Sequence, residues 1–261
     1  MDQSPVLIAT DPSGVATVTI NRPAVRNAID ETVIRLLTDA FATLAADDRV
    51  RIVVLTGTGA AFSAGADLGF MRRAANFSEA ENIASARTIS GMLRSLNELA
   101  KPTIARVNGA AYAAGVGLVA CCDVAIAVED AVFSISEVRV GMVPSTISPY
   151  VVAAIGARAA RRYFLTGEPI SAADACRLGL VHQVVPQSGL DAAVGNVIAA
   201  LMAGAPRSQS RAKRLIAEVA DRPVDDALEA LTARSIAESR ASAEGREGIA
   251  AFLEKRKPSW R

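Results

Sequence analysis

Two short apolar runs constrain the fold of this chain more than any other feature of its sequence. They are "RIVVLTG" at residues 51–57 and "TIARVNG" at residues 103–109, and each ends at a glycine, as is typical of a buried strand. Residues 79–99 between them have a helical pattern, which ends before "KP" at residues 101–102 because the residue before a proline disfavours helix. Strand, helix and strand in this order predict an α/β fold.

The same alternation extends along the chain. Residues 6–10 and 15–20 are rich in β-branched side chains and flank the turn sequence "DPSG", which predicts a β-hairpin. Asp30 is of the type that caps helices, and apolar residues recur at helical spacing from Val33 to Leu44. Further strands are predicted at residues 123–128, 132–135 and 179–185, and helical patterns dominate from Thr146 onward.

The composition is that of a folded protein without an excess of either charge. Of the 261 residues, 51% are hydrophobic and 21% are charged, so the chain can bury a large core. The formal net charge of +1 gives no broad basic surface for nucleic acid or for an anionic membrane. We therefore expect no nucleic-acid partner and no membrane association.

The cysteines and the histidine bear on whether this chain has disulfide bonds or a metal site. The three cysteines include the adjacent pair Cys121 and Cys122, which does not predict a disulfide framework and favours packing in the core. His182 is the only histidine and no metal-ligand spacing is present, so we expect no metal site. The N-terminal sequence lacks the basic start and apolar run of a signal peptide. These features predict a cytoplasmic protein.

A Gly/Ala-rich turn follows each of the two buried strands. "SAGADL" at residues 63–68 follows the first strand, and "AAGVGL" at residues 113–118 follows the second. Small residues let the backbone approach a ligand, and the first N–H groups of a helix have no intrahelical partner. Two such groups aimed at one point would form an oxyanion hole. Each turn taken singly is also compatible with a tight strand-to-helix connection that binds nothing.

Several longer motifs identify a family. These motifs lie at residues 62–68, 101–127, 133–151, 166–185 and 252–260. In them the sequence resembles the crotonase superfamily, the enoyl-CoA hydratases and isomerases, over nearly the whole chain and in the family's order.

The resemblance implies an architecture and a substrate. We expect a spiral of repeated ββα units that binds acyl-CoA at residues 1–200, and a helical oligomerisation region at residues 201–261. Members of this family form homotrimers, which often pair into hexamers. The substrate would be an acyl thioester of coenzyme A, and no cofactor is needed beyond the coenzyme A that the substrate carries.

The resemblance also assigns residues to a site. The thioester oxygen would lie between the backbone N–H groups of Ala66 and Ala114. The positions that would line the adenine and pantetheine are Ala64, Gly65, Asp67 and Leu68, with Asp67 bracing the loop rather than acting as a base. The basic residues that could hold the CoA phosphates are Arg26 and Lys255 or Lys257.

One expected carboxylate is missing. Hydratases of this family generally hold the attacking water with two glutamates; the second corresponds to Glu137, whereas the first corresponds to Gly117. Single-glutamate members include double-bond isomerases and hydratases that resemble methylglutaconyl-CoA hydratase, and this chain looks most like the latter. Because methylglutaconyl-CoA carries its own carboxylate, a second glutamate would repel it in a low-dielectric site. We expect Gly117 to remove that charge and to leave room for the substrate.

Glu137 would then move the protons alone. It would take a proton from water as the oxygen attacks C3 and return a proton to C2, and an apolar pocket would raise its pKa. The alternative for Glu137 is a surface carboxylate paired with Arg139. At the level of function, the alternatives are an isomerase that uses Glu137, or a catalytically silent protein that binds CoA esters or RNA.

Overall fold

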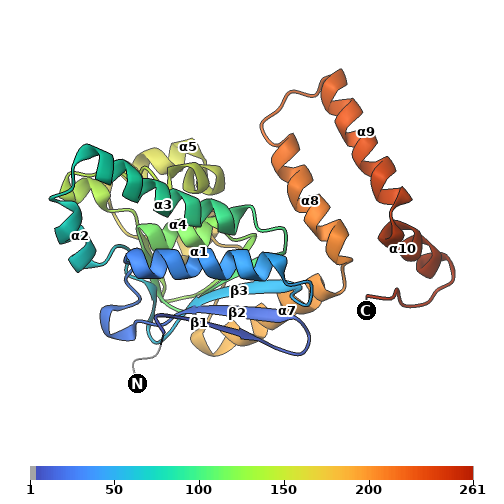
Figure 1. Ribbon diagram of the computed structural model, residues 1–261, viewed down its shortest axis with the longest axis horizontal. Coiled ribbons are helices and arrows are strands. Elements are labelled where there is room, and N and C mark those ends of the chain that lie inside the picture. Colours follow the sequence, from blue (N-terminus) through green and yellow to red (C-terminus); the bar gives the residue numbers. More distant parts are fainter. Residues whose placement is uncertain (1–3, 261) are drawn as a thin grey trace.

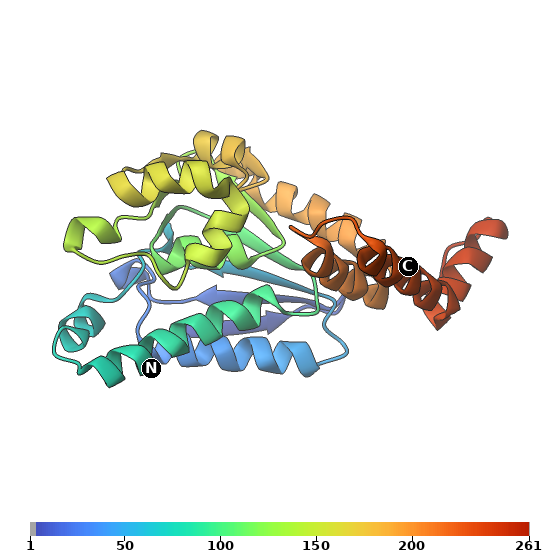
Figure 2. The same cartoon turned by 90° about the horizontal axis from the view of Figure 1, so that it is seen from above.

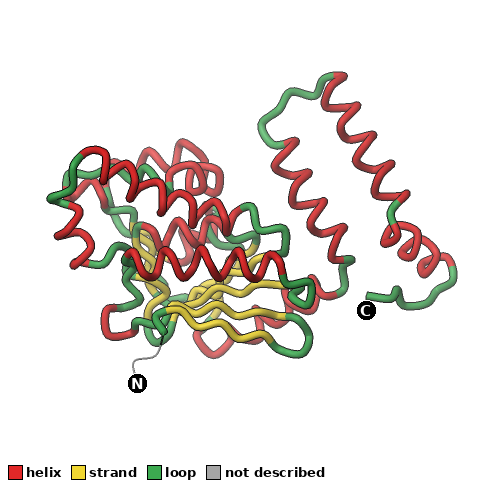
Figure 3. Tube along the Cα trace, in the orientation of Figure 1, coloured by secondary structure: helices red, strands yellow, loops and turns green. Residues whose placement is uncertain are grey.

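The computed structural model describes residues 4–260. Residues 1–3 of the predicted acyl-CoA-binding region and residue 261 of the predicted oligomerisation region lie outside the described residues. A six-stranded sheet with the order β1-β2-β3-β5-β7-β10 lies against a four-stranded sheet with the order β4-β6-β8-β9. Helices cover the outer faces and continue into a separate C-terminal arm (Figures 1 and 3). The predicted α/β class is confirmed.

The first sheet comprises β1 Val6–Thr10, β2 Val15–Ile20, β3 Ile52–Gly57, β5 Thr103–Val107, β7 Val124–Val128 and β10 Gln183–Val185. Strands β1 and β2 form the predicted antiparallel hairpin, and the other neighbours in this sheet are parallel. All six residues of β3 are buried, as expected for an apolar strand covered on both faces. The apolar runs at residues 51–57 and 103–109 therefore form central strands of this sheet.

The second sheet was not predicted in full. It comprises β4 Ala61–Ser63, β6 Ala110–Tyr112, β8 Val132–Ser134 and β9 Ile170–Ser171. Strand β4, which pairs in parallel with β6, lies directly before and overlaps the Gly/Ala-rich turn predicted at residues 63–68. A strand of three residues is too short to show a period in sequence. Each of β3, β5 and β7 thus continues through a turn into a short strand of the second sheet.

The helices are α1 Glu31–Ala46, α2 Leu68–Ala74, α3 Glu79–Asn97, α4 Ala114–Cys121, α5 Ser148–Thr166, α6 Ala172–Leu178, α7 Leu190–Met202, α8 Pro206–Val219, α9 Asp226–Ala241 and α10 Ala243–Leu253. Short 3₁₀ helices lie at Pro23–Val25, Glu137–Val140 and Gln187–Gly189. The side chain of Asp30 accepts a hydrogen bond from the backbone N–H of Val33 at 2.9 Å, so it caps α1 as predicted.

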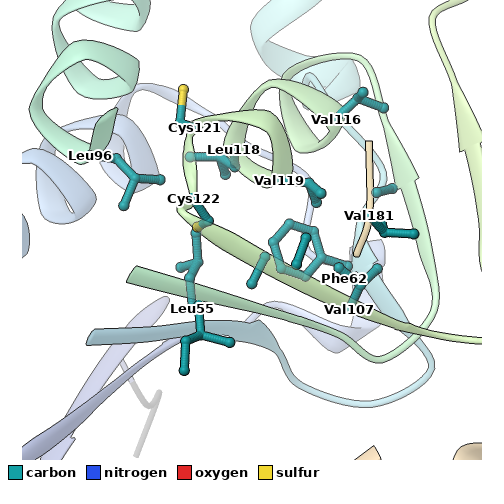
Figure 4. Close-up of a cluster of buried hydrophobic side chains, with 14 of the residues drawn as sticks. Leu55, Phe62, Leu96, Val107, Val116, Leu118, Val119, Cys121, Cys122 and Val181 are labelled. Carbon is teal, nitrogen blue, oxygen red and sulfur yellow. The ribbon is translucent and has the colours of Figure 1, made fainter. Parts of the chain in front are cut away.

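Helix α4 lies in the core of the molecule. Figure 4 shows Leu118 and Val119 of this helix, and Cys122 directly after it, in the same buried cluster as Phe62. Cys121 and Cys122 are buried, and burial raises the pKa of the Cys122 thiol to about 12. Both cysteines therefore serve in packing, as predicted. A helix enclosed in this way holds its N-terminus rigidly against the neighbouring strands.

The three C-terminal helices project from the core (Figures 1 and 2). Their exposed large apolar side chains are Ile216, Ile236, Ile249, Phe252 and Leu253. Apolar surface of this kind is typical of a face that contacts another protein. The division at residue 200 and the homotrimer or hexamer remain predictions. Across residues 4–260, no single helix is long and apolar enough to cross a membrane, and only Gln187–Met202 with Pro206–Val219, bent by 102°, meets that test as a pair.

Candidate active site

The loop after β4 directs the N–H group of Ala66 away from the protein's own acceptors. Ile29 and Ala66 form an isolated parallel bridge. The N–H of Ile29 donates to the carbonyl of Gly65 at 2.7 Å, and the N–H of Asp67 donates to the carbonyl of Ile29 at 2.9 Å. The residues that flank Ala66 make both bonds of the bridge, so its own N–H points to the opposite side. Within the described part of the chain, this N–H has no acceptor.

A second unpaired N–H lies at the start of α4. Ala114 is the first residue of this helix, where the N–H groups have no intrahelical partner. Ala113 before it has φ 47° and ψ −114°, a conformation that favours glycine. Its N–H donates to Ser134 at 2.9 Å and its carbonyl accepts from Gly117 at 3.1 Å, which fixes the peptide that carries the Ala114 N–H. That N–H is also without an acceptor among residues 4–260.

The two loops pack backbone against backbone. A Cβ atom built on Gly65, which has φ +81°, would lie 2.8 Å from the carbonyl oxygen of Tyr112 and 3.1 Å from Cβ of Ala113. A Cβ on Gly115 would lie 3.0 Å from the carbonyl oxygen of Ser63. Glycine is needed at position 65, where a side chain would meet backbone at a positive φ, and a side chain at position 115 would be tightly packed against Ser63. The structure thus brings the predicted donors Ala66 and Ala114 onto adjoining loops.

A buried polar network fixes the first loop. The side-chain amide of Asn27 donates to the carbonyls of Thr58 at 2.9 Å and Ala61 at 2.7 Å. The hydroxyl of Ser63 donates to the carbonyl of Asn27 at 2.9 Å and accepts from the N–H of Gly65 at 3.2 Å. Asn27 and Ser63 are both 0% exposed. This chain of bonds runs from the N-terminal segment to the residue before Ala66.

Replacing Asn27 with alanine is therefore expected to lower the free energy of unfolding by about 2–4 kcal/mol. The change removes two donated hydrogen bonds, and it places alanine at φ 58°, where asparagine is better tolerated. Urea unfolding measures the effect. Asn196→Ala, at an exposed position of α7, is the matched control and should change stability by no more than about 0.5 kcal/mol. Equal stability of the two variants would contradict the role of the network.

Asp67 braces the same loop from its other end. Its carboxylate accepts from the N–H groups of Gly69 at 2.7 Å and Phe70 at 3.2 Å, which caps α2, and it pairs with Arg22 at 3.1 Å. Burial alone would raise the pKa of Asp67, but the two backbone donors and Arg22 outweigh it and lower the pKa. An ionised carboxylate held in this way is a brace, as predicted, and not a base.

Glu137 is a half-buried residue beside these loops, and one oxygen of its carboxyl group is fully buried. It begins the 3₁₀ helix that follows β8, and β8 pairs with β6 through Ser134 and Tyr112. Its Oε2 is buried and has no hydrogen-bond partner within residues 4–260. Desolvation raises the pKa of Glu137, although a backbone hydrogen bond opposes the shift. An unpaired carboxyl in such a place suits proton transfer.

Glu137 is not a surface carboxylate paired with Arg139. The side chain of Arg139 lies instead over Gly167, where a built Cβ would be 3.0 Å from the Arg139 Nε. No salt bridge involves Glu137 in the described part of the chain. The isolation of this carboxyl is what separates it from the structural carboxylates of the molecule.

The expectation that Gly117 leaves room for the substrate is wrong. A Cβ built on Gly117 would lie 2.4 Å from Cγ2 of Ile147 and 3.3 Å from Cδ2 of Leu93. Ile147 is 1% exposed and Leu93 is 0% exposed, so a close-packed apolar layer fills the space. Gly117 accordingly offers no open surface of its own.

The predicted contacts to coenzyme A divide into two groups. Arg26 is exposed and its carbonyl accepts from the N–H of Ala64 at 2.9 Å, so it adjoins the loop at residues 64–68. Leu68, at the start of α2, is 71% exposed. Lys255 and Lys257 follow α10, which lies at the opposite end of the molecule from α2 (Figures 1 and 2). Within one chain, these two lysines therefore lie far from the loop at residues 64–68.

Three residues of the site were missed in the sequence. Asn27 follows a short turn and has the residue type that tolerates positive φ, so a signal was present. Ala113 gave no signal, because alanine rarely adopts its conformation. Ile147 gave none either, because its partner Gly117 is thirty positions away in sequence. A cavity of about 670 Å³ between α1 and α3 contains none of the predicted site residues.

Comparisons with known proteins show the family of this chain. The chain matches the family model of enoyl-CoA hydratase/isomerase over residues 10–261, and it belongs to that family. It is 32% identical to the 2,3-dehydroadipyl-CoA hydratase of Escherichia coli (strain K12), with 98% of each chain covered.

Two solved structures are also similar to this chain. An enoyl-CoA hydratase from Shewanella pealeana has a TM-score of 0.95 at 38% identity, covering 98% of this chain and 96% of that one. An enoyl-CoA hydratase from Mycobacterium smegmatis has a TM-score of 0.93 at 36% identity, covering 99% of both chains. The resemblance to the crotonase superfamily is confirmed, and the chain is an enzyme of the enoyl-CoA hydratase type.

Proposed function

We propose that this enzyme adds water across the double bond of a 2-enoyl-CoA thioester with Glu137 as its only acid–base group. The observation that carries the proposal is the buried and unpartnered Oε2 of Glu137, on a segment bonded to the loop that presents Ala114. Hydration of a conjugated thioester moves negative charge onto the thioester oxygen. Two fixed N–H donors, Ala66 and Ala114, would stabilise that charge, each lowering the barrier by about 3 kcal/mol.

The proton steps balance on one carboxyl group. Glu137 starts ionised and takes a proton from water as the hydroxyl oxygen bonds to C3. The π electrons move to the thioester oxygen and form the enolate. Glu137 then returns its proton to C2 as the enolate collapses, and the carboxylate is restored for the next cycle.

The substrate we infer has an acyl chain with its own carboxylate, as in methylglutaconyl-CoA. The E. coli relative is named for 2,3-dehydroadipyl-CoA, which also bears a free carboxylate. At position 117 a glycine faces the buried side chain of Ile147, so no second ionised group stands there to repel such a substrate.

For the rest of the substrate, we propose that Ala64, Gly65, Asp67 and Leu68 line the adenine and pantetheine and that Arg26 meets a CoA phosphate. Lys255 or Lys257 would have to come from a second copy of the chain, which agrees with the proposed homotrimer or hexamer. A cytoplasmic location remains part of the proposal.

A second candidate function is double-bond isomerisation. One unpaired carboxyl group can remove a proton at C2 of a 3-enoyl-CoA and return it at C4 without any water, so Glu137 would serve this reaction equally well. A catalytically silent protein that binds CoA esters or RNA is not favoured, because an unpaired buried carboxyl costs stability and suits chemistry.

One set of assays separates these functions. Purified protein is given crotonyl-CoA, 3-methylglutaconyl-CoA and a 3-enoyl-CoA, and the absorbance of the conjugated enoyl thioester is followed. Hydration lowers the absorbance of the first two, whereas isomerisation raises it with the third. Binding of the esters by calorimetry with no change in any absorbance would support the silent protein and reject the proposal.

The rate of hydration should depend on the ionisation of Glu137. Because the base must be ionised and burial raises its pKa, kcat/KM should rise with pH to a plateau, with a midpoint above the usual 4.5. A pH profile on crotonyl-CoA measures it. Glu129→Gln, at an exposed glutamate between β7 and β8, should keep the same midpoint. A midpoint at or below 4.5 would place the essential base elsewhere.

A further inference from the structure

Ile147 closes the space beside the oxyanion hole. Gly117 lies three residues after Ala114, so the two positions share one face of α4. A Cβ in a helix tilts toward the N-terminus, which here is the end that presents the unpaired N–H. The side chain of Ile147 already occupies the place that such a Cβ would take. Ile147 therefore covers α4 one turn from the unpaired N–H of Ala114.

Glu137 and Ile147 lie on the same segment, between β8 and α5. The carbonyl of Glu137 accepts from the N–H of Met142 at 3.0 Å, which closes the turn after the 3₁₀ helix. The carbonyl of Ile147 accepts from the N–H of Val151 at 3.1 Å, which ties it to the first turn of α5. The carboxyl group and the isoleucine are thus both fixed to the same short stretch of chain.

We propose that Ile147 is a specificity-determining residue of this enzyme. Its side chain forms an apolar wall beside the oxyanion hole and excludes any side chain, and hence any second carboxylate, from position 117. The acyl chain then meets one ionised group instead of two, which favours an acyl chain with its own carboxylate over a neutral one. This inference rests on the proposed function and adds the residue that sets its substrate preference.

The steric part can be tested without activity. Gly117→Ala should lower the thermal midpoint, because its methyl group meets Ile147, and Ile147→Ala should lower it by leaving a cavity. In the double variant the methyl group enters the vacated space, so the loss should be clearly smaller than the sum of the two single losses. Gly195→Ala, where nothing lies within 4 Å, is the control and should not couple to Ile147→Ala. Additive losses would overturn the proposal.

The proposed effect on substrate preference is tested with a double variant that carries Gly117→Glu and Ile147→Gly, compared with the wild type. The ratio of kcat/KM for crotonyl-CoA to that for 3-methylglutaconyl-CoA should rise at least about tenfold, because a second carboxylate repels the acidic substrate and can assist the neutral one. If the double variant does not fold, the thermal coupling between Gly117→Ala and Ile147→Ala remains the test of the contact.

The outcomes are distinguishable. An unchanged ratio in a folded and active variant would overturn the role of Ile147 while hydration itself stands. A wild-type protein that turns over neither enoyl-CoA would overturn the proposed function, even if the thermal coupling between positions 117 and 147 is observed.

Discussion

Glu137→Gln is expected to lower kcat for hydration by about 100- to 10,000-fold, the contribution typical of a general acid–base group. The amide keeps the size and shape of the side chain but cannot accept a proton from water. The contacts proposed for coenzyme A lie on other loops, so KM should change much less than kcat. Steady-state kinetics on crotonyl-CoA and 3-methylglutaconyl-CoA measure both constants, and Glu129→Gln is the matched surface control.

The same variant should be more stable than the wild type at neutral pH. The raised pKa of Glu137 means that the folded state holds more protons than the unfolded state above the usual 4.5. Wild-type stability therefore falls as pH rises from 4.5 through the folded-state pKa, and glutamine does not take part in this loss. Thermal midpoints of both proteins at several pH values measure the difference. Full activity in Glu137→Gln would remove this residue from the mechanism.

Gly65→Ala is expected to lower kcat by about 100- to 1,000-fold, the cost of losing one oxyanion-hole donor. The new Cβ would lie 2.8 Å from the carbonyl oxygen of Tyr112, at a φ of +81° that alanine rarely adopts. The loops that carry Ala66 and Ala114 would have to move apart, so their N–H groups would no longer meet at one oxygen. We also expect a loss of about 2–4 kcal/mol in the free energy of unfolding.

The control separates the site from a general effect of glycine replacement. Gly195→Ala in α7 has no neighbour within 4 Å of its new methyl group. It should keep full activity and gain about 0.5–1 kcal/mol from the higher helix propensity of alanine. Binding of a CoA ester by calorimetry shows whether Gly65→Ala still forms the complex. A variant that is folded and fully active would show that the two loops do not form the oxyanion hole together.

Local sequence determined the elements whose signals lie in contiguous residues. The buried strands β3 and β5, the hairpin of β1 and β2 and the cap at Asp30 all follow from periods or residue types within a few positions. Glu137 and the donors Ala66 and Ala114 could be named because they lie in motifs that keep the family's order.

The tertiary structure decided what depends on contacts between distant residues. The short strands β4 and β6 exist because they pair with each other, and Gly65 meets Tyr112 only after that pairing has formed. Whether Glu137 is dry or solvated depends on everything packed around it. At Gly117 the sequence showed a missing side chain, whereas the structure showed Ile147 filling its place. The physical reason is that periodicity and residue type act over neighbours in the chain, whereas burial and close packing act between segments that the fold brings together.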